Sequence, residues 1–146
     1  IAFLAIDRDG DGLITSGKQL FGDSAVPGAT NGFDALMRTA DMEGGSGGGS
    51  VSSDDPVFSR LLLWTDSNHN GVSEPSELRP ASELVSDIGL SYQRHNRRDR
   101  FGNQYRFRGW VLMRTAPGRN RSPFPRDADA RRRWIYDVFL TTLPQK

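Results

Sequence analysis

Apolar residues recur at helical spacing in the first part of the chain. Phe33, Leu36 and Met37 fall on one helical face, directly after Asn31, which can cap a helix. A second helical run opens with an Asp-Pro pair, which favours the first turn of a helix. The helices expected in this part of the chain cover 17–22, 31–38, 55–64 and 75–78.

From residue 87 onward the period of the pattern changes to two. Apolar residues alternate with polar ones, as in a half-buried β-strand. Turn-forming residues at 98–103 separate two of these runs and predict a β-hairpin. The strands expected here cover 88–92, 105–111 and 133–140, and the segment 115–129, rich in Pro and Arg, is expected to be an exposed loop.

Residues 66–77 have the spacing of a twelve-position calcium-binding loop. Oxygen-bearing side chains stand at positions 1, 3 and 5, glycine at position 6, and a glutamate that can give two oxygens at position 12. A hard cation takes six to eight oxygens, and this spacing places them around one point. The predicted side-chain ligands are Asp66, Asn68, Asn70 and Glu77, and the alternative is an Asx-rich surface turn.

Residues 7–18 repeat the first half of this pattern. Position 12 is Lys18, which cannot ligate a cation, so the ion would take Gln19, a water molecule or Asp23 instead. We therefore expect weaker binding here than at 66–77, or a vacant loop. In paired loops, the apolar residue at position 8 usually forms a short β-contact with its partner. The predicted carboxylate ligands are Asp7, Asp9 and Asp11.

A third loop is degenerate. Its exit would fall at Val51 and Asp55, but glycines and one serine occupy the positions that should hold ligands. We expect this loop to bind no metal. The segment 44–50 has the composition of a flexible linker, either native or engineered.

Charge divides the chain near the point where the periodicity changes. Residues 1–90 carry fourteen acidic and five basic side chains, whereas residues 91–146 carry four acidic and fourteen basic ones. The acidic part contains the two loops, so calcium would neutralise part of its charge and stabilise it. The absence of cysteine excludes disulfides and thiolate metal sites.

The chain opens with an apolar run at 1–6, without a methionine or a basic leader. This run is too short for a signal sequence or a membrane span. We therefore expect a domain cut from a longer parent chain, with no membrane span.

Several segments together resemble a bacterial EF-hand-containing family, whose members commonly form parts of large secreted or surface proteins, some of the RTX type. These segments are 7–15, 19–23, 31–36, 55–66, 68–73, 99–108 and 136–139. The resemblance implies calcium ligation by the seven side chains named above and adds the backbone carbonyls of Leu13 and Val72. The family usually has glutamate where this sequence has Gln19.

These observations predict an α+β fold in a single domain, 1–146. An EF-hand-like helix–loop–helix module would occupy 1–87 and bind one or two Ca²⁺ ions. A small antiparallel β-sheet, formed by a hairpin and a C-terminal strand, would occupy 88–146.

The expected function is a non-catalytic, calcium-stabilised module of a secreted or cell-surface bacterial protein. Self-processing modules of some similar-looking RTX proteins cleave an Asp-Pro bond under calcium control, so Asp55-Pro56 offers an alternative. In that reaction the aspartate carboxylate attacks its own carbonyl group. The same dipeptide is also ordinary capping at a helix start. His69 and His95 are too few for a hydrolase triad or a transition-metal site.

Arginines surround the predicted hairpin beside aromatic residues, a combination that can bind acidic polysaccharide or single-stranded nucleic acid. As an alternative partner, an acidic polysaccharide or protein ranks ahead of nucleic acid. The favoured interpretation is that the arginines point outward and pair with the acidic half. The residues concerned are Arg94, Arg97, Arg98, Arg100, Arg106 and Arg108, with Tyr92, Phe101, Tyr105 and Phe107.

Overall fold

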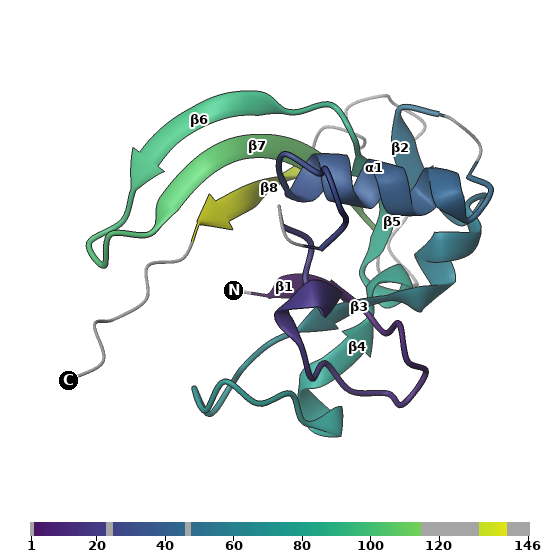
Figure 1. Cartoon of the computed structure of the whole chain (residues 1–146), viewed down its shortest axis with the longest axis horizontal. Coiled ribbons are helices and arrows are strands. Elements are labelled where there is room, and N and C mark those ends of the chain that lie inside the picture. The colour runs from purple at the N-terminus through teal and green to yellow at the C-terminus, as the bar shows by residue number, and fades with distance from the viewer. Residues whose placement is uncertain (1, 23–24, 46–47, 115–131, 140–146) are drawn as a thin grey trace, which may run out of the picture.

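The computed structural model describes residues 2–22, 25–45, 48–114 and 132–139. Within these ranges the chain forms one α-helix, two antiparallel sheets and several single-turn 3-10 helices (Figure 1). The helix is α1 (Gly32–Met42), and the strands are β1 (Phe3–Ile6), β2 (Ser50–Ser52), β3 (Leu61–Trp64), β4 (Leu78–Pro80), β5 (Val85–Gly89), β6 (Gln93–Arg98), β7 (Gln104–Met113) and β8 (Arg132–Phe139). The 3-10 helices are η1 (Gly17–Gln19), η2 (Pro56–Arg60), η3 (Pro75–Glu77) and η4 (Ala81–Glu83).

The predicted helix–loop–helix architecture is wrong, because no helix pair brackets either loop in the described ranges and the fold is mostly β. The run expected as a helix over 55–64 forms only the short η2 before it continues as β3. A short apolar run suits a helix or a buried strand equally. Here β3 lies between β1 and β4 and pairs with both, so its backbone bonds are satisfied by the sheet.

The helix expected at 31–38 is confirmed, and it extends to Met42. The Asn31 side chain accepts a hydrogen bond from the Asp34 backbone N–H at 3.0 Å, as an N-cap should. Phe33 and Leu36 are buried. Met37 is 41% exposed, so the apolar face of the helix is narrower than the sequence predicts.

The smaller sheet has the strand order β1-β3-β4. Its central strand pairs Leu62 with Ala5 on one side and with Pro80 on the other. Leu20, which follows η1, adds an isolated bridge to Ala5 on the outer edge. Both chain segments that enter a loop, β1 and β3, are therefore neighbours in one sheet.

The larger sheet is built on β7, which pairs with β5 and β6 along one edge and with β8 along the other. The predicted hairpin at 98–103 and the predicted C-terminal strand are both confirmed. The strand expected at 88–92 instead ends at Gly89, and Tyr92 leaves the ladder to stack on Phe33, with ring centroids 5.3 Å apart. The loop expected at 115–129 lies outside the described residues.

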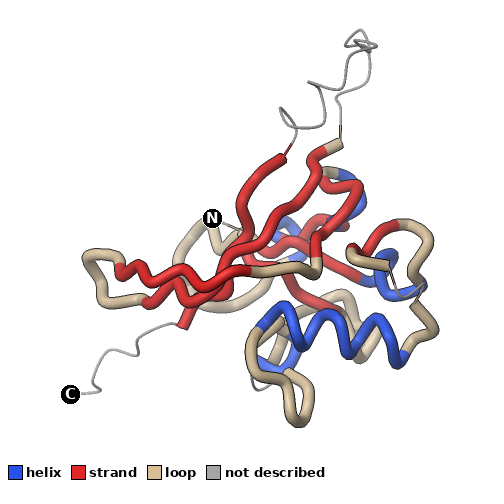
Figure 2. Tube along the Cα trace, turned by 90° about the horizontal axis from the view of Figure 1, so that it is seen from above, coloured by secondary structure: helices blue, strands red, loops and turns tan. Residues whose placement is uncertain are grey.

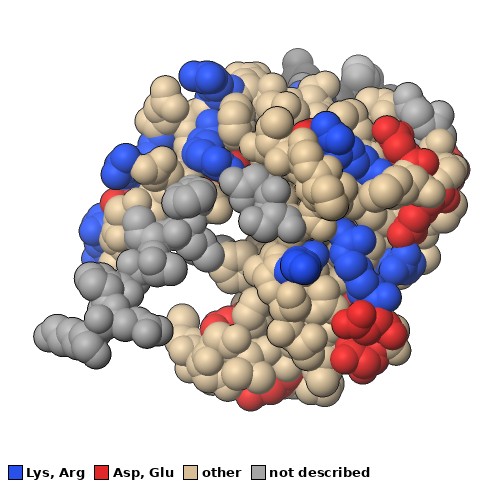
Figure 3. All heavy atoms as spheres, in the orientation of Figure 1, with Lys and Arg blue, Asp and Glu red and all other residues tan. Residues whose placement is uncertain are grey.

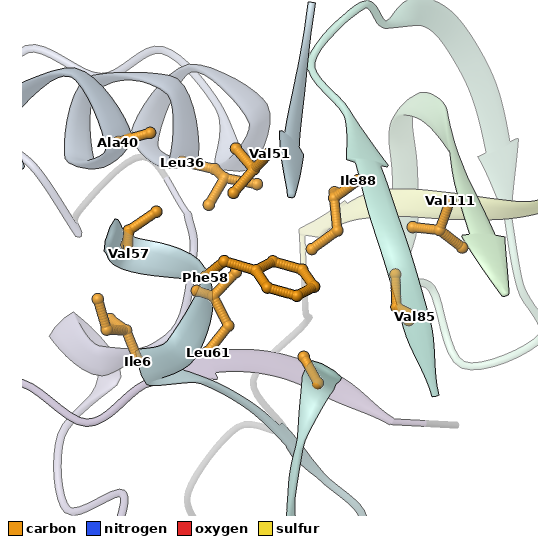
Figure 4. Packing of buried hydrophobic residues seen from close by; sticks show 11 residues of the cluster. Ile6, Leu36, Ala40, Val51, Val57, Phe58, Leu61, Val85, Ile88 and Val111 are labelled. Atoms are coloured by element: carbon orange, nitrogen blue, oxygen red, sulfur yellow. The ribbon is translucent and has the colours of Figure 1, made fainter. Parts of the chain in front are cut away.

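One buried cluster joins the helix to both sheets. It contains Leu36 from α1, Leu61 from β3 and Ile88 from β5, packed around Phe58 of η2 (Figure 4). The turn end of the β6–β7 hairpin reaches away from this core and from α1 (Figure 2). The core thus fixes the small sheet and its two loops, and leaves the hairpin to present a separate surface.

Candidate metal-binding loops

The first loop (7–18) and the second loop (66–77) occupy equivalent places in the small sheet. Each follows a strand, β1 or β3, and each ends in a single 3-10 turn, η1 or η3. After that turn the chain returns to the same sheet, as the Leu20 bridge in one case and as β4 in the other. The second loop is therefore a strand–loop–strand unit, and the first runs from a strand to a single bridge, so neither loop has the flanking helices that we expected.

The two loops share their internal hydrogen bonds. The carboxylate at position 1 accepts from the backbone N–H at position 6, Asp7 from Gly12 and Asp66 from Gly71, at 2.9 Å in both loops. The side chain at position 5 accepts from the N–H at position 7 in the same way, at 2.9 Å for Asp11 and 2.8 Å for Asn70. These bonds fold each loop around its first and fifth side chains.

The backbone also turns in the same way in both loops. Positions 4 and 6 have left-handed φ angles, 73° and 77° at Gly10 and Gly12, and 57° and 71° at His69 and Gly71. Glycine adopts this conformation without steric cost. His69 does not, and it is the one non-glycine residue with positive φ in the described ranges. The second loop therefore keeps the shape of the first despite an unfavourable residue.

The loops meet at their eighth positions. The Ser73 hydroxyl accepts a hydrogen bond from the Ile14 backbone N–H at 2.7 Å and donates to the Ile14 carbonyl at 2.9 Å. Both residues are buried. The expected contact between the paired loops is thus present, but the Ser73 side chain, and not its backbone, makes the two hydrogen bonds to the Ile14 backbone.

Glu77, at position 12 of the second loop, folds back over the start of that loop. One carboxylate oxygen accepts from the Ser67 N–H and hydroxyl, both at 2.9 Å, and the other accepts from the Trp64 indole N–H at 3.3 Å. Burial raises the pKa of Glu77, but these hydrogen bonds outweigh burial, so its pKa lies below the usual value. The carboxylate is therefore held ionised inside the loop.

The end of the first loop is organised differently. The Gln19 side-chain oxygen accepts from the Thr15 and Ser16 N–H groups, at 2.8 and 3.1 Å, and its amide donates to the Leu13 carbonyl at 3.4 Å. Two predicted calcium ligands, Gln19 and Leu13, thus bond to each other. At the start of the loop, hydrogen bonds from Gly12 and Gly10 lower the pKa of Asp7 despite an opposing effect of burial.

The sequence reasoning missed Glu74, at position 9 of the second loop. Its two carboxylate oxygens accept from the side-chain amides of Asn68 and Asn70, at 2.9 and 3.0 Å. In loops of this type the residue at position 9 often binds the ion through a water molecule, so an acidic residue at that position was the sequence signal for Glu74. In the second loop, Glu74 thus contacts both side-chain amides, and Glu77 contacts Ser67 next to Asp66 at the start of the loop.

Each loop gathers the side chains of its predicted ligands. In the described residues no three acidic or histidine side chains are grouped closely enough to hold an ion by themselves, so amide and carbonyl oxygens would have to complete either site. Oxygens of the predicted ligands accept hydrogen bonds from backbone N–H groups. Val72, whose carbonyl was a further predicted ligand, is exposed, and so is Asp9. The donor set still fits a hard cation, since it consists of carboxylate, amide and carbonyl oxygens.

The degenerate third loop has other contacts. Glu43 forms an ion pair with Arg60, and the Gly45 N–H bonds to the Ala40 carbonyl and closes α1. Asp55 is buried, and its carboxylate accepts from the Ser52 N–H at 3.0 Å. Part of the expected linker at 44–50 falls outside the described residues.

Comparison with known proteins gives a family and a distant relative. The family model described as the SPM domain matches residues 2–119. The Iron-regulated protein FrpA of Neisseria meningitidis serogroup C is 32% identical over 105 residues, which cover 68% of this chain and 9% of FrpA. The chain thus spans about a tenth of that relative. No helix in the described ranges is long and apolar enough to cross a membrane.

Proposed function

Since the chain belongs to the SPM domain family, and since it matches a small part of a much longer bacterial protein, we propose that it is a non-catalytic, calcium-stabilised module of a larger protein. The expected resemblance to modules of large bacterial proteins holds at this level. We further propose that the parent protein is secreted or displayed at the cell surface, where calcium is abundant.

The observation that carries this proposal is the equivalence of the two loops. Each has a carboxylate at position 1 bonded to the N–H at position 6, and each has left-handed residues at positions 4 and 6. This is the backbone that a calcium loop needs in order to turn its oxygens inward. Ordinary turns that were unrelated would have no reason to share it.

Calcium would complete the second loop more readily than the first. The second loop offers Asp66, Asn68, Asn70 and Glu77, with the Val72 carbonyl, and Glu74 stands at position 9 to hold a water or the ion itself. Binding would require Glu77 to exchange its bonds to Ser67 for the ion. Loops of this kind in extracellular modules bind calcium with dissociation constants on the order of 10⁻⁴–10⁻³ M.

The first loop would bind more weakly. Its ligands would be Asp7, Asp9 and Asp11, with the Leu13 carbonyl, whereas Gln19 contributes at most one neutral oxygen. A cation would draw the three carboxylates together and offset the repulsion that this approach creates. The two ions would then act as structural parts of the fold, because a ligand that binds only the folded state stabilises it.

A catalytic role at Asp55-Pro56 has less geometric support. Self-processing needs the Asp55 carboxylate to attack its own carbonyl carbon and release the Pro56 amine. The carboxylate bonds to the Ser52 N–H, and the carbonyl accepts from the Phe58 N–H at 3.1 Å at the start of η2. Mass spectrometry after calcium addition decides this question, since cleavage would split the chain at residue 55.

The test of the proposed function is a calcium titration by calorimetry on chelator-treated protein, with thermal melts before and after. We expect one or two sites and a rise in melting temperature, with little effect of an equal concentration of magnesium, which demands a tighter octahedral site. If calcium produces no binding heat and no shift in melting temperature, the proposal is overturned.

A further inference from the structure

Three arginine–aromatic pairs cross the outer part of the larger sheet, and we call them the arginine ladder. In each pair the guanidinium of one strand lies over a ring of its neighbour. The distances from the guanidinium carbon to the ring centroid are 5.4 Å for Arg97 over Tyr105, 4.3 Å for Arg108 over Trp134, and 5.3 Å for Arg132 over Trp110. Each pair thus joins β7 to β6 or to β8.

The strand register places the ladder on one face of the sheet. Trp110 is directly opposite Trp134, and Arg108 is opposite Tyr136, so these side chains project to the same side. The opposite side of β7 carries Phe107, which meets the Tyr92 ring, and the buried Val111. One face of β7 therefore packs toward α1 and the core, and the other carries the ladder.

Tyrosine rings lie between the arginine–aromatic pairs of the ladder. Tyr136 makes an edge contact with Tyr105, with centroids 5.5 Å apart, and its other neighbour is His95 at 5.3 Å. Between the levels of Tyr105 and Arg132 the row extends over roughly 20–25 Å, at about 3.4 Å per residue. The result is an extended line of cations, each held over a ring, along one face of the curved sheet (Figure 1).

In the described residues no ladder arginine forms a close ion pair with a carboxylate, although the charge of Arg97 acts on Asp99, whose pKa is lowered first by the Asn103 side chain and also by Arg97. There the ion pairs join Arg38 to Asp34, Arg60 to Glu43, Arg79 to Glu83, and Arg106 to Asp137. None contains a ladder arginine, and the expectation that the hairpin arginines pair with the acidic half is wrong for Arg106, whose partner lies on β8. In Figure 3, several basic side chains lie along the hairpin arm with little acidic surface among them, whereas on the opposite side of the molecule basic and acidic side chains lie side by side.

We propose that the arginine ladder is a binding surface for a linear acidic polysaccharide that carries carboxylate or sulfate groups. Arginine is suited to this ligand because its planar fork donates two parallel hydrogen bonds to such a group. Rings that hold each guanidinium in place lower the entropy lost on binding. The extended row matches a chain with repeated charges better than it matches a single small anion.

The same geometry disfavours single-stranded nucleic acid. Proteins that bind it leave aromatic faces open for successive bases to stack. Here a guanidinium already lies over a face of Tyr105, Trp110 and Trp134. The rings therefore serve to hold cations, and charge recognition is what the surface offers.

The experiment measures the affinity of the whole chain for heparin oligosaccharides of two lengths, in about 1 mM calcium. The ladder variant carries Arg97→Gln, Arg108→Gln and Arg132→Gln. The matched control carries Arg38→Gln, Arg60→Gln and Arg79→Gln, which remove the same charge from ion pairs elsewhere. We expect the ladder variant to lose about tenfold or more in affinity and the control at most about threefold.

A second variant, Trp134→Leu, keeps every charge and removes one ring. It should weaken heparin binding several-fold, because Arg108 loses its platform, and a decasaccharide should bind more tightly than a disaccharide. Equal losses in the ladder and control variants would overturn the proposal, because net charge alone would then explain binding. Tighter binding of an oligothymidine than of heparin would also overturn it, in favour of nucleic acid.

Discussion

The Ser73 hydroxyl bridges the backbone N–H and carbonyl of Ile14, 59 residues away in the sequence. Both bonds are short, and both residues are buried. One side chain thus satisfies two backbone groups of the first loop from within the second loop. Because the contact lies at position 8 of each loop, any ion that orders one loop would also order the position to which the other is attached.

Replacing Ser73 by alanine should separate the loops. The Ile14 N–H and carbonyl would stay buried without their partner, so we expect the free energy of unfolding to fall by about 2 kcal/mol. Urea unfolding in the presence of a chelator measures this loss. Ser76→Ala is the matched control, because Ser76 is exposed in the same loop. A loss as small as that of the control would show that water replaces the hydroxyl and that the bridge contributes little.

Replacing Gln19 by glutamate should have opposite effects with and without calcium. Without the ion, the new carboxylate would face the Leu13 carbonyl to which the amide now donates, so the melting temperature in chelator should fall. With the ion, the carboxylate could ligate it, so the calcium-dependent rise should grow and the first site should tighten by about tenfold. Gln93→Glu, an exposed change on β6, is the control. An unchanged calcium response would remove the first loop from the proposal.

Much of the site could be predicted from the sequence because it depends on interactions between residues that are close together in the chain. The spacing of Asp7 and Asp66 relative to the glycines that follow them fixes the loop conformation, and the Asn31 cap fixes the start of α1, all within a few residues. The segments that flank the loops could not be predicted in the same way. The short apolar run Leu61–Trp64 is compatible with a buried helix and with a buried strand. Its pairing with β1, more than fifty residues earlier in the chain, decides the matter. The Ser73 bridge depends on that same distant pairing.

Acid should destabilise the metal-free protein. Hydrogen bonds lower the pKa values of Asp7, Asp34, Glu77 and Asp99 in the folded chain. The unfolded chain then takes up protons first as the pH falls, so this stability is complete above the usual carboxyl range and is lost below about pH 4. Thermal melts in chelator between pH 7 and pH 3 measure the loss.

Asp34 provides the comparison within this pH series. Its pKa is lowered chiefly by the Thr30 N–H and then by the Arg38 side chain, at 2.9 and 3.0 Å. Asp34→Asn removes the titrating group, so melting temperature should fall less steeply below pH 4 than in the parent. Parallel curves for the two proteins would exclude Asp34 as a source of the acid sensitivity.

Asp137 connects the last described strand to the start of the helix. One carboxylate oxygen accepts from the Gly32 N–H at 3.0 Å, and the other pairs with Arg106 at 2.9 Å. Asp137→Ala should cost about 2–3 kcal/mol of unfolding free energy, because it leaves a helix N–H and a partly buried guanidinium without this partner. Denaturant unfolding measures the loss, and Asp54→Ala, at an exposed aspartate, is the control. Equal stability of the two variants would mean that β8 is not anchored through Asp137.

Gly89 leaves room for the Trp110 ring of the ladder because it has no Cβ. A Cβ at Gly89 would lie 2.4 Å from the Trp110 ring, the same ring over which the Arg132 guanidinium lies. Gly89→Ala should therefore displace Trp110, lower the unfolding free energy by about 1–3 kcal/mol and shift tryptophan emission to longer wavelength. Gly22→Ala is the control, because a Cβ at Gly22 meets no atom within 4 Å. Heparin affinity should fall with the displaced ring, since Arg132 would lose its platform. A variant with parental stability and emission would show that Trp110 moves aside freely, and that its stacking with Arg132 does not fix the guanidinium in place.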